Sequence, residues 1–179
     1  MYQDCERLSL SKLARAQMPY TFWHFLLKAL HNVEDCGVLY IEISKVYQNF
    51  NEIPTFHNST KLKLHSINSN WDLLFRMLNH CPNLQNGTDF GYGRQFNAPQ
   101  NWVDPKFVPQ CLSLYLKTCT IWYFEDELDE LQLATYILNN ARVLQSMKFS
   151  CYATLKKERE LSLCSKASPK CELIFHVLP

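Results

Sequence analysis

The chain has 179 residues, of which 47% are hydrophobic and 13% aromatic, and its formal net charge is +1 at pH 7. This length suits one domain or one compact array, and the apolar content is enough for a packed core, which excludes wholesale disorder. A nearly neutral chain has no long-range field for nucleic acid or an anionic membrane. Its cations also alternate with acids, as in Lys156-Lys157-Glu158-Arg159-Glu160, which we interpret as a solvated helix surface.

The cysteines and the first apolar cluster indicate a reducing compartment. No C-x-x-C pair occurs, and a chain of this length and apolarity needs no disulfide scaffold. The apolar cluster at 22–30 is broken by His24 and Lys28, so it predicts neither a signal peptide nor a membrane span. We therefore expect a cytoplasmic or nuclear protein. We expect buried free thiols at Cys5, Cys36, Cys81, Cys111, Cys119, Cys151, Cys164 and Cys171.

Short apolar strands recur along the chain at a regular spacing. Successive starts are roughly 23 to 31 residues apart, close to the leucine-rich-repeat period of about 20–29. Strands that alternate with helical segments predict an α/β fold, with a curved parallel sheet and helices on its outer side. The predicted strands span 38–43, 61–67, 115–121, 146–152 and 171–177, with a degraded strand near 84–90.

A helix is predicted after the second of these strands. It begins at Asn70, or at Ser69 with Asp72 three residues later as a capping pair, and it ends at Pro82. A strand and helix of this kind cannot cover their own apolar faces, so neighbouring units must stack. The residues expected on the apolar side of the helix are Leu74, Met77, Leu78 and Cys81.

A second helix follows the acidic run at 125–130, where negative charge suits the positive end of a helix dipole. Residues 77–85 and 137–145, at the ends of the two helices, share Leu, Asn, Leu and Gln at four matching positions, although chance similarity between leucine-rich stretches stays open. A shortened last helix is expected at 155–166. The second helix is expected to bury Leu131, Ala134, Ile137, Leu138 and Ala141.

Three phrases near the C-terminus together resemble the FBD domain of plant F-box proteins. They are W-x-x-P-x-x-V-P-x-C-L at 102–112, A-x-Y-I-L-x-N-A at 134–141 and S-x-x-C-x-L-x-F at 168–175. The preceding part is similar to the leucine-rich repeats that come before such domains. We therefore divide the chain into leucine-rich-repeat-like units at 1–98 and an FBD domain at 99–179, with an Asn- and Pro-rich joint at 96–109.

The resemblance implies a non-enzymatic protein-interaction module, similar to the substrate-recognition part of ubiquitin-ligase adaptors. No segment before Phe22 resembles an F-box, so docking on a cullin-ligase adaptor is not implied. An alternative stays open: a truncated fragment without ligase function, or a competitor of full-length relatives. The target protein would bind outward-facing strand residues, which we predict to be Tyr40, Glu42, Lys61, Lys63, His65, Lys117 and Cys119.

Patterns typical of catalytic, cofactor and metal sites do not occur in this sequence. No G-x-S-x-G elbow is present, and Gly91-Tyr92-Gly93 lacks the third glycine and the Lys-Ser/Thr of a phosphate loop. The pair His80-Cys81 has no partner pair at zinc spacing. Trp122 and Tyr123 have no basic stripe beside them for stacking bases, so we expect them to fill a loop core. We therefore expect no catalytic residue, no cofactor, no metal and no nucleic-acid or membrane partner.

Overall fold

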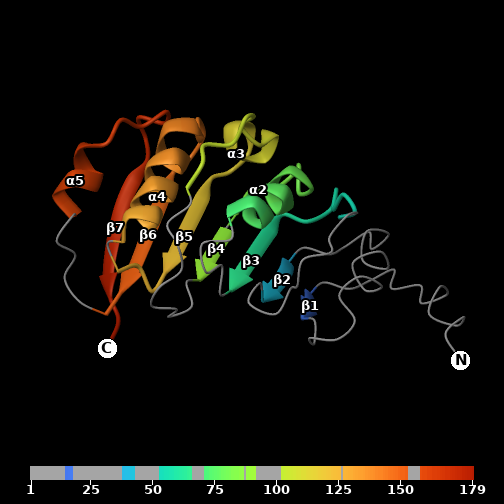
Figure 1. Cartoon of the computed structure of the whole chain (residues 1–179), viewed down its shortest axis with the longest axis horizontal. Coiled ribbons are helices and arrows are strands. Elements are labelled where there is room, and N and C mark those ends of the chain that lie inside the picture. Colours follow the sequence, from blue (N-terminus) through green and yellow to red (C-terminus); the bar gives the residue numbers. More distant parts are fainter. Residues whose placement is uncertain are drawn as a thin grey trace, which may run out of the picture.

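The computed structural model describes residues 15–17, 38–42, 53–65, 71–86, 88–91, 102–125, 127–152 and 158–179. Seven strands in these ranges form one open sheet in chain order, and every neighbouring pair is parallel (Figure 1). The strands are β1 (Arg15–Gln17), β2 (Val38–Glu42), β3 (Lys61–His65), β4 (Thr88–Gly91), β5 (Thr118–Trp122), β6 (Ser146–Cys151) and β7 (Glu172–Val177). The predicted α/β class with a parallel sheet is confirmed.

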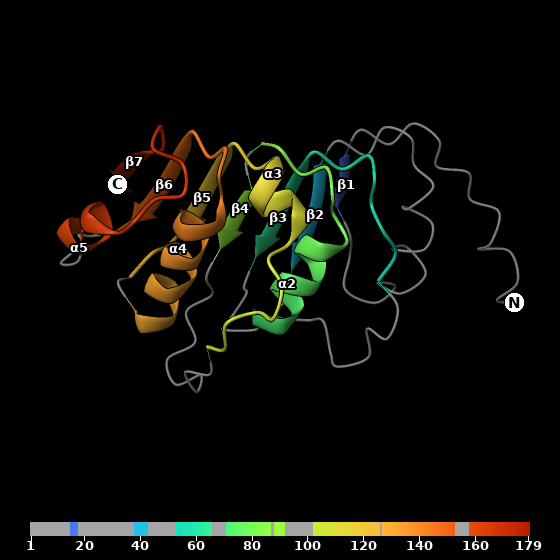
Figure 2. The ribbon, with the colours of Figure 1, turned by 90° about the horizontal axis from the view of Figure 1, so that it is seen from above.

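Helices cover one face of the sheet. Seen from above, the helices form a layer on one side of the strands (Figure 2). They are α2 (Trp71–Asn79), α3 (Gln110–Leu114), α4 (Leu128–Asn140) and α5 (Glu158–Leu163). None of the helices in the described part of the chain has the length and apolarity that a membrane span requires.

The helix α2 matches its predicted apolar side. Leu74, Met77 and Leu78 are buried in it, and Cys81 is buried just beyond its end, which comes at Asn79 before Pro82. The expected capping residues at 69 and 70 lie outside the described residues. All five residues expected in the core from the second helix are also buried: Leu131, Ala134, Ile137, Leu138 and Ala141.

Two predicted strands begin later than expected. The strand expected at 115 begins at Thr118, because the preceding residues form α3 and the N–H groups of Tyr115 and Leu116 donate to Cys111 O. The degraded strand expected near 84–90 is β4, because Leu84 lies in a turn and donates its N–H to Cys81 O at 3.3 Å. The last helix ends at Leu163, three residues before the end of the expected range 155–166, and residues 155–157 of that range lie outside the described residues.

The two similar stretches 77–85 and 137–145 have the same local structure. Leu84 N–H donates to Cys81 O, and Leu144 N–H donates to Ala141 O at 3.4 Å. Each turn ends at a glutamine whose backbone joins a row of hydrogen bonds across the starts of the strands. The row runs from Thr60 through Gln85, Lys117 and Gln145 to Glu172, and the distances from donor nitrogen to acceptor oxygen are 2.9, 2.7, 2.7 and 2.9 Å. Shared geometry at matching positions argues against chance similarity.

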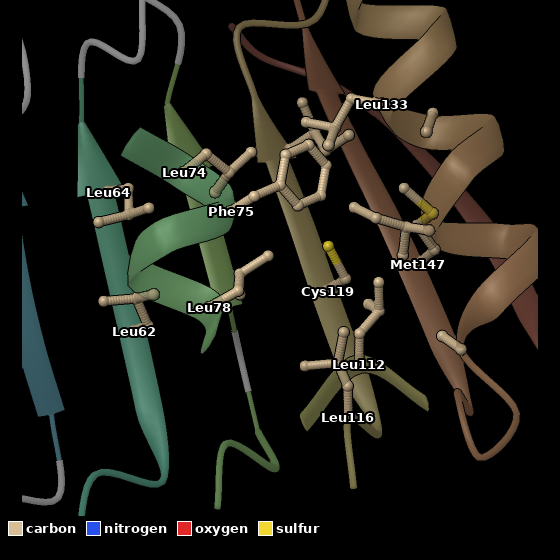
Figure 3. Close-up of a cluster of buried hydrophobic side chains, with 14 of the residues drawn as sticks. Leu62, Leu64, Leu74, Phe75, Leu78, Leu112, Leu116, Cys119, Leu133 and Met147 are labelled. Carbon is tan, nitrogen blue, oxygen red and sulfur yellow. The ribbon is translucent and has the colours of Figure 1, made fainter. Parts of the chain in front are cut away.

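The core lies between the sheet and the helices (Figure 3). Leu62 and Leu64 of β3 point toward Leu74 and Leu78 of α2, and all four are buried. Full burial of such a side chain contributes about 1.5–3 kcal/mol, so this layer is the main source of stability. The core continues through Leu112, Leu116, Cys119, Leu133 and Met147.

Four aromatic side chains join α2 to α4 on the helix side, and we call them the aromatic junction: Trp71, Phe75, Trp102 and Tyr136. The ring of Trp102 packs edge-on against those of Trp71 and Phe75, with centroids 5.2 and 5.7 Å apart, and it meets Tyr136 at 5.9 Å. Edge-to-face pairs of this kind contribute about 0.5–1.5 kcal/mol beyond area burial. The β4–β5 pairing also carries the sheet across residue 99. The division at 98/99 stays a prediction.

Candidate interaction surface

The sheet face opposite the helices presents alternate side chains of each strand, and we call it the open face. In β3, Lys61 and Lys63 are half-buried while Leu62 and Leu64 are fully buried on the other side. The same alternation continues in β5, in β6 as far as Phe149 and in β7 as far as His176, whereas Ser150 near the end of β6 is fully buried. The described side chains of the open face are Lys61, Lys63, Thr118, Thr120, Trp122, Ser146, Lys148, Glu172, Ile174 and His176.

Strand register arranges these residues in rows across the sheet. The middle row crosses six strands, from β2 to β7. Its length is about 24 Å, because neighbouring strands lie roughly 4.8 Å apart. The backbone register therefore gives a row of positions long enough to contact an extended segment of another protein. The described side chains of this row are Lys63, Thr120, Lys148 and Ile174, and the register places the backbone of Tyr40 and Asp89, whose side chains are outside the described set, in the same row.

The residues predicted for the binding surface fall into three groups. Lys61 and Lys63 lie on the open face. The register places Tyr40 beside Lys63 and Glu42 beside His65, although the side chains of Tyr40, Glu42 and His65 are outside the described set. Lys117 is exposed but precedes β5, at the starting edge of the sheet.

The prediction that Cys119 faces outward is wrong. Cys119 is 1% exposed and points toward the helices. The predicted outward positions Lys117 and Cys119 would make Lys117 the counterpart of Lys63, but the register aligns Lys63 with Asp89 and then with Thr120, three residues further on. An odd shift along a strand exchanges its two faces, so the predicted outward positions of β5 were inverted. Thr118, Thr120 and Trp122 face outward instead.

An aromatic group at the end of the open face was not predicted as part of it. We call Trp122, Tyr123 and Tyr152 the aromatic end. The rings of Tyr123 and Tyr152 are stacked, 5.6 Å apart and 18° from parallel, and Trp122 lies 6.4 Å from Tyr123. Tyr152 is 50% exposed, whereas Trp122 and Tyr123 are half-buried. Every second residue of β5 faces outward, so an outward Thr120 predicts that Trp122, two residues later, also lies on the open face.

The backbone explains why this group stays at the surface. Tyr123 has a φ of 60°, an uncommon left-handed conformation for a large side chain. The chain turns there, so that Phe124 N–H donates to Ser150 O at 3.0 Å and the Phe124 ring packs on Phe149 in the core. Phe124 therefore fills the loop core that we expected Trp122 and Tyr123 to fill.

The electrostatics of two titratable side chains near the core, Cys111 and His80, favour their neutral forms. Burial raises the pKa of Cys111 to about 12, and its Sγ donates to Leu78 O at 3.2 Å, so the thiol stays protonated. Burial, and then the nearby Arg76, lower the pKa of His80. Within the described ranges, no three His, Cys, Asp or Glu side chains are placed to hold a metal ion.

Comparison with known proteins identifies the part of the chain that contains β5 and most of β6. The family model described as FBD matches residues 104–149. The chain contains an FBD domain. The match begins two residues after Trp102 of the aromatic junction and ends at Phe149 in β6, so the FBD domain contributes α3, β5 and α4. Trp122 and Tyr123 of the aromatic end belong to it, whereas Lys61 and Lys63 precede it.

The chain is also similar to longer plant proteins. F-box/FBD/LRR-repeat protein At3g26920 of Arabidopsis thaliana is 37% identical over 130 residues, which cover 68% of this chain and 30% of that protein. Putative F-box/FBD/LRR-repeat protein At3g49030 of the same plant is 39% identical over 118 residues, or 59% of this chain and 26% of that protein. The chain thus spans under a third of the length of these relatives. No solved structure matches the chain.

Proposed function

We propose that this chain is a non-enzymatic protein-interaction module that binds a target protein on the open face. The observation that carries this proposal is the arrangement of the described elements: the helices α2, α3, α4 and α5 lie on one face of the sheet (Figure 2), and alternate side chains of β3, β5, β6 and β7 are directed to the other. A rigid sheet holds such side chains at fixed spacing before binding, which reduces the entropy lost on association. The plant relatives named for F-box, FBD and LRR elements support an interaction role.

The architecture that we propose is a short leucine-rich-repeat-like solenoid that ends in the FBD domain. Parallel strands in chain order and the row of backbone hydrogen bonds from Thr60 to Glu172 support it, since each repeat of a solenoid contacts its neighbours. The equivalent turns at Leu84 and Leu144 support a repeated unit. Such arrays present extended surfaces to their partners.

The target contact would centre on the aromatic end. Tryptophan and tyrosine dominate the few residues that carry most of the binding energy in protein interfaces. Trp122 sits where the open face meets Tyr123 and Tyr152, and Lys148 lies on the neighbouring strand beside Thr120. This arrangement combines rigid aromatic area with a nearby positive charge. Lys61 and Lys63 would extend the contact toward β3.

We propose that the module recognises a target protein for ubiquitination and that it works in the cytoplasm or nucleus, as the sequence predicts. The transfer chemistry would belong to other subunits. A competitor of full-length relatives would bind the same target without a ligase. Co-purification from plant cells separates the two: recovery of a cullin-ligase adaptor with the chain favours the ligase role, and recovery of the target without it favours the competitor.

Quantitative binding tests the proposed surface. Once a target is recovered, its dissociation constant is measured with the wild-type chain and with Trp122→Ala, for which we expect binding about tenfold weaker or more. Lys148→Glu should also weaken binding. Arg142→Glu is the matched control, because Arg142 is exposed in the turn after α4, outside the strands that form the open face. Equal loss of binding in the control, or unchanged binding in both test variants, would refute the open face as the binding surface.

A further inference from the structure

The last strand of the sheet leaves one edge unpaired. In the described part of the chain, no strand lies beyond β7 (Figure 1). Glu172 N–H donates to Gln145 O at 2.9 Å and Leu178 N–H donates to Cys151 O at 2.7 Å, so the even-numbered residues direct their backbone groups toward β6. In a strand, backbone direction alternates, so Leu173, Phe175 and Val177 direct their N–H and C=O groups away from the sheet.

The same edge also leaves apolar side chains incompletely covered. On the helix side of β6, Met147, Phe149 and Cys151 are at most 2% exposed. On the same side of β7, Leu173 and Phe175 are only half-buried, and Val177 is 54% exposed. The Phe175 ring stacks on Phe149 with centroids 5.1 Å apart. One side of that ring is therefore covered by the core, and nothing in the described residues extends the sheet on the other.

The strand β7 lacks two of the features that usually protect a sheet edge from pairing. Natural edge strands often carry lysine or proline or are very short. The six residues of β7 read Glu-Leu-Ile-Phe-His-Val, with no lysine and no proline. By contrast, β1, the strand at the other edge of the described sheet, has three residues and includes Arg15. The β7 edge is therefore the one suited to accept another strand.

The β7 sequence is complementary to itself in antiparallel orientation. We propose that two copies of this chain associate by pairing β7 with β7 about a two-fold axis at Ile174. Only residues on the same face stand opposite one another across such an axis. This register sets Glu172 opposite His176 of the second copy and Leu173 opposite Phe175 of the second copy. By symmetry, each of these contacts occurs twice.

The residues that direct their backbone N–H and C=O groups away from the sheet are the ones that this register pairs by hydrogen bonds. In an antiparallel pair, opposite residues alternate between those that exchange both backbone hydrogen bonds and those that exchange none. Leu173 and Phe175 both direct their backbone groups outward, so they exchange both bonds. Glu172 and His176 form the other type of pair, in which side chains are closer, and this suits attraction between a carboxylate and an imidazole.

If the two-fold axis passed through Phe175, the backbone hydrogen bonds could still form, but the side chains that stand opposite one another would no longer be complementary. Ile174 would then stand opposite His176 of the second copy, and Glu172 opposite Leu178 of the second copy. Apolar side chains would meet charged or polar ones at both positions, which favours the axis at Ile174. A single edge pairing buries less surface than a standard interface of about 1,200–2,000 Å², so the dimer should be weak.

Charge reversal tests the proposed pairing in the full chain. Sedimentation velocity, measured over a wide range of concentration reaching high micromolar, should show a monomer–dimer equilibrium. Glu172→Lys should raise the dimer dissociation constant roughly tenfold, because both symmetric pairs then lose their attraction. The double variant Glu172→Lys/His176→Glu should restore the dimer, since opposite charges face each other again. Glu160→Lys, an exposed change on α5, is the control and should leave the dissociation constant unchanged.

Amide hydrogen exchange gives an independent test that a folding defect does not imitate. In the dimer, the amides of Leu173, Phe175 and Val177 should exchange more slowly as concentration rises, while those of Glu172 and Ile174 should not change. A monomer at every concentration would overturn the proposal. So would a dimer that Glu172→Lys does not weaken, or one that the double variant does not restore.

Discussion

Trp71 Nε1 donates a hydrogen bond of 3.4 Å to Asp129 Oδ2, which joins α2 to the start of α4 across 58 residues of sequence. Asp129 is 5% exposed, and its other oxygen has no hydrogen-bond partner. A buried carboxylate held by one long hydrogen bond depends strongly on that bond. This contact fastens the FBD domain to the helix that precedes it.

Trp71→Phe should therefore destabilise the chain by about 1–3 kcal/mol, because it leaves the Asp129 carboxylate without its donor. Asp129→Ala should cost a similar amount by leaving the indole N–H unpaired. Denaturant unfolding of the two variants and of the double variant measures the coupling. We expect a coupling energy of about 1 kcal/mol, and strictly additive losses would contradict the contact.

Glu130 predicts a stability that falls as pH rises. Its Oε2 accepts from Glu125 N–H at 2.7 Å and Glu127 N–H at 3.3 Å, but burial dominates and raises its pKa from 4.5 to about 8. The folded chain therefore holds this proton more tightly than the unfolded chain. The protonated Glu130 therefore contributes fully to the free energy of unfolding below pH 4.5, and this contribution is lost as pH rises from 4.5 to 8. The loss amounts to a few kcal/mol, since each pKa unit corresponds to ~1.4 kcal/mol.

Glu130→Gln keeps an acceptor for the two N–H groups and removes the titration. Thermal unfolding between pH 5 and 8 should therefore show a smaller loss of stability in the variant than in the wild type. The exposed Glu158 in the first turn of α5 provides a matched control, and Glu158→Gln should keep the wild-type slope. Identical slopes for Glu130→Gln and the wild type would contradict the buried state of this carboxyl.

The two faces of β5 should respond oppositely to the same substitution. Cys119→Lys places a charge in the core and should unfold the chain, at a cost of about 4 kcal/mol or more. Thr120→Lys places the same side chain on the open face and should change stability by about 0.5 kcal/mol or less. Circular dichroism and denaturant unfolding measure both. A folded Cys119→Lys variant would mean that the register of β5 is incorrect.

The left-handed backbone at Tyr123 should make glycine preferable to alanine there. Tyr123→Ala loses the stacking on Tyr152 and keeps the strained φ of 60°, whereas Tyr123→Gly loses the stacking and relieves the strain. We expect Tyr123→Gly to be more stable than Tyr123→Ala by about 1 kcal/mol. The opposite order, measured by thermal unfolding, would show that the turn is not strained.

Alternation and helical spacing were sufficient to predict the parallel sheet and the buried sides of α2 and α4. The prediction failed where position depended on residues distant in sequence. The short helix α3 delays β5 to Thr118, and the face of Cys119 depends on its pairing with Thr88 in β4. Similarly, the outward position of Trp122 follows from register, whereas the turn at Tyr123 follows from the need to bury Phe124 against Phe149.

Site-specific crosslinking tests the central claim, that the open face binds a target protein. A photoreactive amino acid replaces Thr120 in the middle row of the open face, or Asn139, which is exposed on α4. We predict that the target crosslinks to position 120 and not to position 139. Crosslinking at position 139 alone would place the interaction on the helices and contradict the account.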